Sequence, residues 1–86
     1  MSTDVQAIRC LSGSEAEVLE FIVKPNSPAT KARIRDLELP KDVIVGGIVR
    51  GDKVFIADGS TRINAYDRVV VFAMPSAIGL IGDYFN

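Results

Sequence analysis

The stretch over residues 42–57 constrains the fold most, because it has the pattern of two strands joined by a tight turn. It reads Asp-Val-Ile-Val-Gly-Gly-Ile-Val-Arg-Gly-Asp-Lys-Val-Phe-Ile-Ala, and most of its side chains are β-branched or aromatic, which suits a pleated sheet. Between the strands, Gly51-Asp52 supplies a two-residue loop whose first position can take a positive φ, as a type II′ turn requires. The sequence therefore predicts a central β-hairpin.

The first strand of this hairpin is apolar on both faces, because side chains alternate along a strand. The expected faces are Val43, Val45 and Val49 on one side, and Ile44 and Ile48 on the other. Such a strand needs cover on both sides, either from helices or from a second copy of the protein. At Gly46-Gly47 two interpretations stay open, a bulge, which we favour, or the close approach of a ligand.

The composition indicates a small globular domain without a nucleic-acid-binding surface. The 86 residues are 48% hydrophobic and 24% charged, and 10 basic against 11 acidic residues give a net charge of -1, so a basic footprint is missing. No apolar run approaches the roughly 20 residues that cross a bilayer. Cys10 is the single cysteine and no secretory signal precedes it, which predicts a cytoplasmic chain.

The residues give little support for an enzyme. Histidine is absent, so the commonest general base and metal ligand are both missing. Asp52, Asp58 and Asp67 all occupy predicted turns, where aspartate is common because its side chain bonds its own backbone. Neither a P-loop nor a dinucleotide-binding glycine motif occurs. We predict no catalytic residue and no metal site.

The rest of the chain predicts three more strands and two helices. A strand over residues 4–11 ends at Ser12-Gly13-Ser14, and a second over residues 17–24 ends at Pro25. Pro28 to about Asp36 is predicted to be a short helix. Residues 68–73 form a nearly continuous apolar strand, typical of burial on both faces. Residues 75–85 predict a terminal helix.

The expected fold class is therefore α+β. The sheet is small, mainly antiparallel or mixed, and has four to five strands, with a short helix after the first main strand and a C-terminal helix. Residues 1–86 are expected to form one domain, with a lead-in strand and turn over residues 1–15 and the core over residues 16–86.

Four short motifs occur in an order and spacing that resemble one known family. They are Ala16-Glu17-Val18-Leu19-Glu20-Phe21, Leu37-Glu38-Leu39-Pro40, Ile48-Val49-Arg50 and Arg68-Val69-Val70-Val71-Phe72. Over residues 17–85 the chain resembles the TrkA C-terminal domain, also called the RCK C-terminal domain, and most resembles the last such domain of the Trk regulatory proteins.

The resemblance implies a cytoplasmic regulatory and dimerisation domain of a Trk-type potassium uptake system, held near the inner membrane by a membrane transporter subunit. In this family a separate Rossmann part binds NAD or ATP, so no cofactor is expected in this domain, which would be a fragment of a longer protein. Some members bind a nucleotide effector such as cyclic di-AMP. The alternative is an effector-binding regulatory domain of a cation/proton antiporter or another carrier.

Two hypotheses about function follow from the resemblance. In the first, the domain senses an effector through Val45, Ile48, Arg50 and Ile56, and the Arg50 guanidinium meets a phosphate. In the second, the domain is a ligand-free homodimerisation module whose two-faced apolar strand and glycine-bearing terminal helix are buried against a twin. We favour the second hypothesis, because packing explains every apolar feature and only Arg50 points to a ligand.

Overall fold

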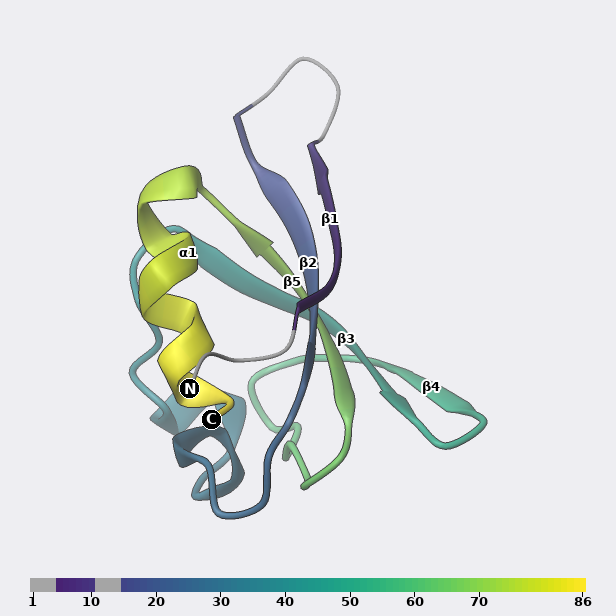
Figure 1. The fold of residues 1–86 in the computed structure, drawn as a ribbon. Coiled ribbons are helices and arrows are strands. Elements are labelled where there is room, and N and C mark those ends of the chain that lie inside the picture. Colours follow the sequence, from purple (N-terminus) through teal and green to yellow (C-terminus); the bar gives the residue numbers. More distant parts are fainter. Residues whose placement is uncertain (1–4, 11–14) are drawn as a thin grey trace.

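The structure is a computed structural model that describes residues 5–10 and 15–86, and it contains a five-stranded antiparallel sheet with one α-helix on one face (Figure 1). The strands lie in the order β1-β2-β5-β3-β4. Their bounds are β1 Val5–Cys10, β2 Glu17–Ile22, β3 Val43–Arg50, β4 Lys53–Ile56 and β5 Arg68–Ala73. The helix α1 spans Pro75–Ile81, and single 3-10 turns lie at η1 Pro28–Thr30, η2 Ile34–Asp36 and η3 Gly82–Tyr84. The α+β class and the C-terminal helix are confirmed, whereas the break predicted at Ser12-Gly13-Ser14 lies outside the described residues.

The central hairpin is confirmed, with β3 and β4 joined at Gly51 and Asp52. Gly51 has a φ of 62°, and Asp52 is not among the residues with positive φ, which agrees with the type II′ turn that the sequence predicts. Beyond this turn β4 pairs only with β3, so the hairpin forms an arm that extends away from α1 (Figure 1).

Gly51 and Gly79 give one substitution with opposite expected effects. A Cβ added at either glycine meets no heavy atom within 4 Å, so packing contributes nothing at either position. We expect Gly51→Ala to lower the free energy of unfolding by about 1 kcal/mol, because its φ is left-handed. Gly79→Ala, within α1, should raise it by about 0.5–1 kcal/mol. Urea denaturation of both variants tests this. A change in the free energy of unfolding in the same direction for both would contradict the prediction.

The segment after β2 differs from the single short helix predicted from Pro28 to about Asp36. It contains two separate 3-10 turns, η1 and η2, between which Arg33 has an extended backbone and bridges to Arg62. The amides of Ile34 and Arg35 donate to the carbonyls of Thr61 and Gly59, each at 3.0 Å. A continuous helix would need these amides for its own ladder, so the contact with the 59–62 loop divides the segment.

A β-bulge at Gly46 corrects the predicted faces of β3. Val45 lies opposite Val71, but Gly47 lies opposite Val70, so Gly46 is the extra residue. The bulge shifts the alternation by one position, which turns Ile48 to the same side as Val45 and turns Val49 to the other side. Val45 and Ile48 are both buried in the core. Of the two interpretations of Gly46-Gly47, the bulge is the one confirmed.

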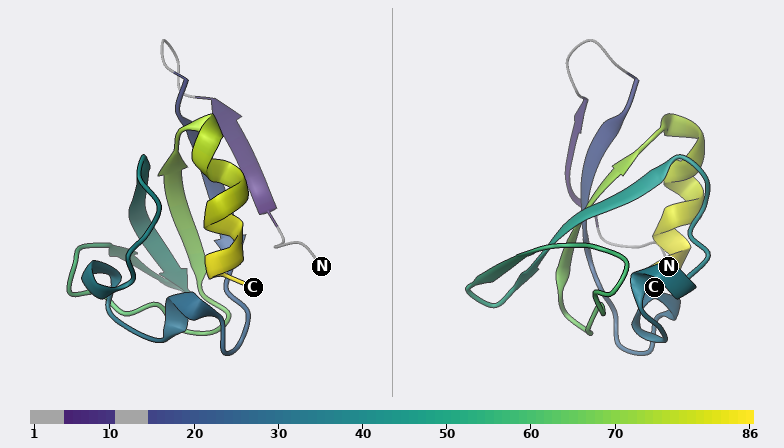
Figure 2. Two further views of the ribbon diagram at one scale, coloured as in Figure 1. Left: turned by 90° about the vertical axis from the view of Figure 1, so that its left-hand side faces the viewer. Right: turned by 180° about the vertical axis from the view of Figure 1, so that it is seen from behind.

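The core lies between one face of the sheet and the segment that ends in α1 and η3 (Figure 2). Ala77 and Ile81 of α1 and the following Phe85 point inward, and the Phe85 ring stacks on Phe21 of β2 with centroids 4.9 Å apart. The fully buried side chains come mainly from the central strands β2, β5 and β3. They include Leu19, Phe21, Val23, Ile48, Ile63, Val69, Val71, Ile81 and Phe85.

Strand β5 is buried on one face, not on both as its apolar run suggested. Val69, Val71 and Ala73 are at most 1% exposed and face the core, whereas Val70 and Phe72 are only half-buried on the other face. Within the part of the chain that the structure describes, α1 and the 3-10 turns all gather on the core side (Figure 2). The opposite face of the sheet is therefore left without a covering layer from these elements.

Candidate interaction surface

The uncovered side of the sheet is an apolar surface, which we call the open face. Its side chains come from alternate positions of β2, β5, β3 and β4, as the strand register and the Gly46 bulge require. It consists of Val18, Glu20, Ile22, Ile44, Val49, Val54, Ile56, Arg68, Val70 and Phe72. Eight of these ten residues are hydrophobic, so the open face has the composition of a surface that becomes buried.

Exposure on the open face is greatest on the two strands at its β4 edge, β3 and β4. Ile44 is 67% exposed, Val54 72% and Ile56 85%, values that are high for side chains of this size. Cross-strand pairs connect them to the central strands, since Val54 lies opposite Val49 and Ile44 lies opposite Phe72. The exposed residues therefore form one continuous surface.

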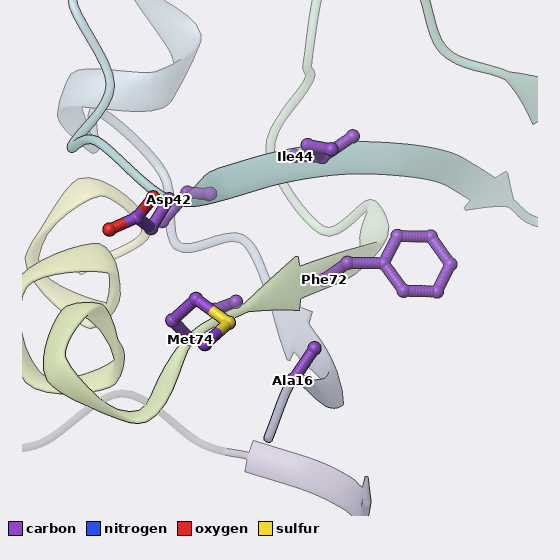
Figure 3. Close-up of a pocket in the computed structure, with 7 residues that line it drawn as sticks. Ala16, Asp42, Ile44, Phe72 and Met74 are labelled. Carbon is purple, nitrogen blue, oxygen red and sulfur yellow. The ribbon is translucent and has the colours of Figure 1, made fainter. Parts of the chain in front are cut away.

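A cleft of about 410 Å³ lies at one end of the open face, where the start of β3 meets the end of β5 (Figure 3). Its lining is Ala16, Asp42, Val43, Ile44, Phe72, Ala73 and Met74. The amide of Met74 donates to the Asp42 carbonyl at 3.1 Å. This hydrogen bond connects the two segments that form the walls of the cleft. The volume suits a small ligand, but Asp42 is the only charged residue in the lining, so the cleft lacks a cation for a phosphate.

Arg50 and the buried Asp67 form a partly buried ion pair on the core side of the sheet. The Arg50 Nε and Nη2 donate to the two Asp67 carboxylate oxygens at 2.9 and 2.8 Å, and Nη2 also donates to the Arg62 carbonyl at 3.1 Å. The backbone amide of Asn64 donates to Asp67 Oδ2 at 2.8 Å. The bonds to the Asp67 carboxylate raise the pKa of Arg50. The pair fastens the hairpin arm to the turn before β5.

The aromatic ring of Phe55 also contacts the Arg50 guanidinium. The guanidinium carbon lies 5.0 Å from the centroid of the Phe55 ring, within the range of a cation–π contact. Ring, carboxylate and carbonyl together hold the guanidinium, so Arg50 links β3, β4 and the 62–67 turn.

The four ligand contacts predicted from the sequence are not brought together around one cavity. Val45 and Ile48 lie in the core, and Arg50 is engaged by Asp67. Ile56 lies on the open face at the exposed end of β4. None of the four lines the cleft. Ligand binding by these residues stays a prediction.

The sequence reasoning missed the partner of Arg50. Asp67 was predicted only as a turn residue, and it does accept the Asn64 amide, but it also binds a cation 17 residues away. The one signal in the sequence is positional, because Arg50 ends one strand and Asp67 immediately precedes another. That signal becomes informative only once β3 and β5 are known to be neighbours.

Asp58, by contrast, is a turn residue as predicted. Its Oδ1 accepts the amide and the hydroxyl of Ser60 at 2.8 and 2.6 Å, and the hydroxyl of Thr61 lies at 3.3 Å. The hydrogen bonds from Ser60 lower the pKa of Asp58. Among the described residues no group of three His, Cys, Asp or Glu side chains is placed to hold a metal ion.

These features define the class of protein, a small α+β domain with an exposed apolar sheet face. The chain belongs to the TrkA-C domain family, which matches residues 18–86. The family resemblance drawn from the sequence is thereby confirmed. None of the helices in the described parts of the chain is long and apolar enough to cross a membrane.

Three curated proteins that are similar to this chain are each much longer than it. It is 29% identical over 86 residues, its full length, to the Trk system potassium uptake protein TrkA homolog 1 of Methanosarcina mazei, of which it covers 19%. It is 43% identical over 69 residues to the TrkA homolog of Archaeoglobus fulgidus, an alignment that covers 80% of this chain and 16% of that protein. It is 30% identical over 82 residues to the Trk system potassium uptake protein TrkA of Azorhizobium caulinodans, an alignment that covers 95% of this chain and 18% of that protein. The chain thus spans less than a fifth of the length of these relatives.

Proposed function

We propose that this domain pairs with a second copy of itself through the open face, and that this pairing assembles and regulates a Trk-type potassium uptake protein. The role is regulatory and non-enzymatic, and it is exerted in the cytoplasm through a membrane transporter subunit. Membership of the TrkA-C family and the names of the relatives support the potassium transport context.

The observation that carries the dimer proposal is the exposure of the open face. An apolar surface that spans four strands is unfavourable in water, and each buried Å² of it contributes roughly 25 cal/mol. Two of the most exposed residues, Val54 and Ile56, lie on β4, whose only strand partner in the described sheet is β3. A second copy presents the same apolar surface and supplies the cover that the sequence predicts for β3.

The structure gives less support to a nucleotide sensor. The guanidinium of Arg50 is the one cation in the predicted ligand set, and it already donates three hydrogen bonds. These bonds use Nε and Nη2, so a phosphate would meet only the Nη1 group of a guanidinium whose charge the Asp67 carboxylate already balances. The cleft beside the open face offers a carboxylate instead of a cation. Assembly is therefore the function that the geometry favours.

Light scattering across a concentration series tests the proposed function. The unsubstituted domain is expected to have twice its 9.3 kDa mass at micromolar concentration. The double variant Val54→Asp/Ile56→Asp should be monomeric, because two carboxylates would be desolvated in the interface. Both residues are exposed in the monomer, so its circular dichroism should not change.

Leu80→Asp is the matched control for this experiment. Leu80 is also a large exposed hydrophobic residue, but it lies on α1 and not on the open face. This variant should remain dimeric. A monomeric unsubstituted domain, or a dimer that Leu80→Asp disrupts and Val54→Asp/Ile56→Asp does not, would overturn the proposal.

A further inference from the structure

Two charged residues interrupt the apolar open face, and they have opposite signs. Glu20 lies on β2 opposite Val70, and Arg68 lies on β5 opposite Ile22. These four residues mark the corners of one rectangle, with Glu20 and Arg68 at the ends of a diagonal. Among the residues whose side chains the structure describes, neither charge has an ion-pair partner.

In a two-fold symmetric dimer, the positions of Glu20 and Arg68 restrict how the two copies can pair. In an isologous interface residue i contacts residue j of the partner, and j contacts i in return. One acid and one base on the same surface therefore form two equivalent ion pairs if the axis bisects the line between them. A two-fold register that buries Glu20 and Arg68 without pairing them leaves both charges desolvated, which is costly.

We infer that the second copy docks in one register, in which Glu20 pairs with the partner's Arg68 and the two-fold axis runs near the Ile22–Val70 diagonal. This inference rests on the proposed dimer and adds its partner contacts. Val70 then lies close to the partner's Val70. Gly47, which faces the same side, lies next on the axis and has no side chain to keep the two sheets apart.

The rest of the open face fits this register. On a sheet with strands about 4.8 Å apart and about 6.8 Å between alternate residues, reflection across this axis brings Ile56 onto the partner's Ile44. In projection onto the sheet, the same operation leaves Val49 offset by about 3 Å from the partner's Val18, and Val54 offset equally from the partner's Phe72. Apolar residues therefore meet apolar residues throughout. The strands of the two sheets cross at about 70°, near the orthogonal class of sheet packing.

Charge reversal tests the register. Glu20→Arg places two arginines together at each pairing point, and Arg68→Glu places two glutamates together. Each single variant is expected to weaken the dimer at least about tenfold, because like charges oppose each other at two equivalent places. The double variant Glu20→Arg/Arg68→Glu should restore the dimer. A mixture of the two single variants should form a heterodimer, since every pairing point then joins opposite charges.

A cysteine on the axis gives an independent readout. In a Cys10→Ser background, Val70→Cys should be crosslinked to the partner's Val70→Cys by a short bismaleimide, because the two copies of the residue face each other across sheets that pack roughly 10 Å apart, too far for a direct disulfide. Val18→Cys, also on the open face but away from the axis, should not crosslink to itself. This measurement needs no charge reversal and also reports on variants that dimerise weakly.

The outcomes separate the register from the dimer itself. An unsubstituted domain that dimerises, with no rescue in the double variant and no crosslink at Val70, overturns the register and leaves the proposed function standing. A strictly monomeric unsubstituted domain overturns both. Rescue together with the Val70 crosslink supports both.

Discussion

Replacing Phe85 by alanine is expected to lower the free energy of unfolding by about 4 kcal/mol, the largest effect of any single substitution considered. The side chain is fully buried, and its ring stacks on Phe21 with centroids 4.9 Å apart. Removing it leaves a cavity and takes away the contact that joins the end of the chain to β2. Because a domain of this size has a stability of only about 5–10 kcal/mol, a large fraction of it would be lost.

Urea denaturation followed by circular dichroism measures this loss. All variants should be compared at one protein concentration, because dimerisation adds to the apparent stability. Leu80→Ala is the matched control, since Leu80 is a large side chain on the nearby helix but is 59% exposed. It should change the stability by no more than about 0.5 kcal/mol. Similar losses in the two variants would show that Phe85 is not part of the core as described.

Arg50→Ala should cost about 3 kcal/mol of unfolding free energy. It leaves the carboxylate of Asp67, which is 1% exposed, with the Asn64 amide as its remaining described hydrogen-bond donor. Breaking a buried ion pair by removing one partner costs roughly 3–5 kcal/mol. The lower end applies, because the Arg50 side chain is 37% exposed and water can partly replace it.

Thermal and urea denaturation of Arg50→Ala, Arg50→Lys and Arg62→Ala test this role. Lysine keeps the charge but cannot donate to both carboxylate oxygens in the fork geometry, so Arg50→Lys should retain part of the stability. Arg62 takes part through its backbone carbonyl, and its side chain is exposed, so Arg62→Ala should resemble the unsubstituted domain. A loss below 0.5 kcal/mol for Arg50→Ala would contradict the structural role. If the loss is found, Arg50→Ala alone cannot be used to locate a ligand site.

The strands and the hairpin turn were predictable because their signals are local. Strand β5 has the predicted bounds of 68–73, and the turn is at the predicted Gly51 and Asp52. β-Branched runs favour a strand, and a glycine favours the positive φ of the turn, whatever surrounds them. The surface that we propose for assembly was less predictable, because its membership depends on which side each residue of β3 faces.

The sequence by itself determined the α+β class, the β3–β4 hairpin and the C-terminal helix, because propensity and turn chemistry act between residues close along the chain. Only the tertiary structure decided the two 3-10 turns in place of a helix, the Gly46 bulge, the one-sided burial of β5 and the Arg50–Asp67 pair. Each of these depends on strands and loops far apart in sequence meeting in one register. Because one bulged residue exchanges the faces of all residues after it, the open face exists as a surface only in the folded sheet.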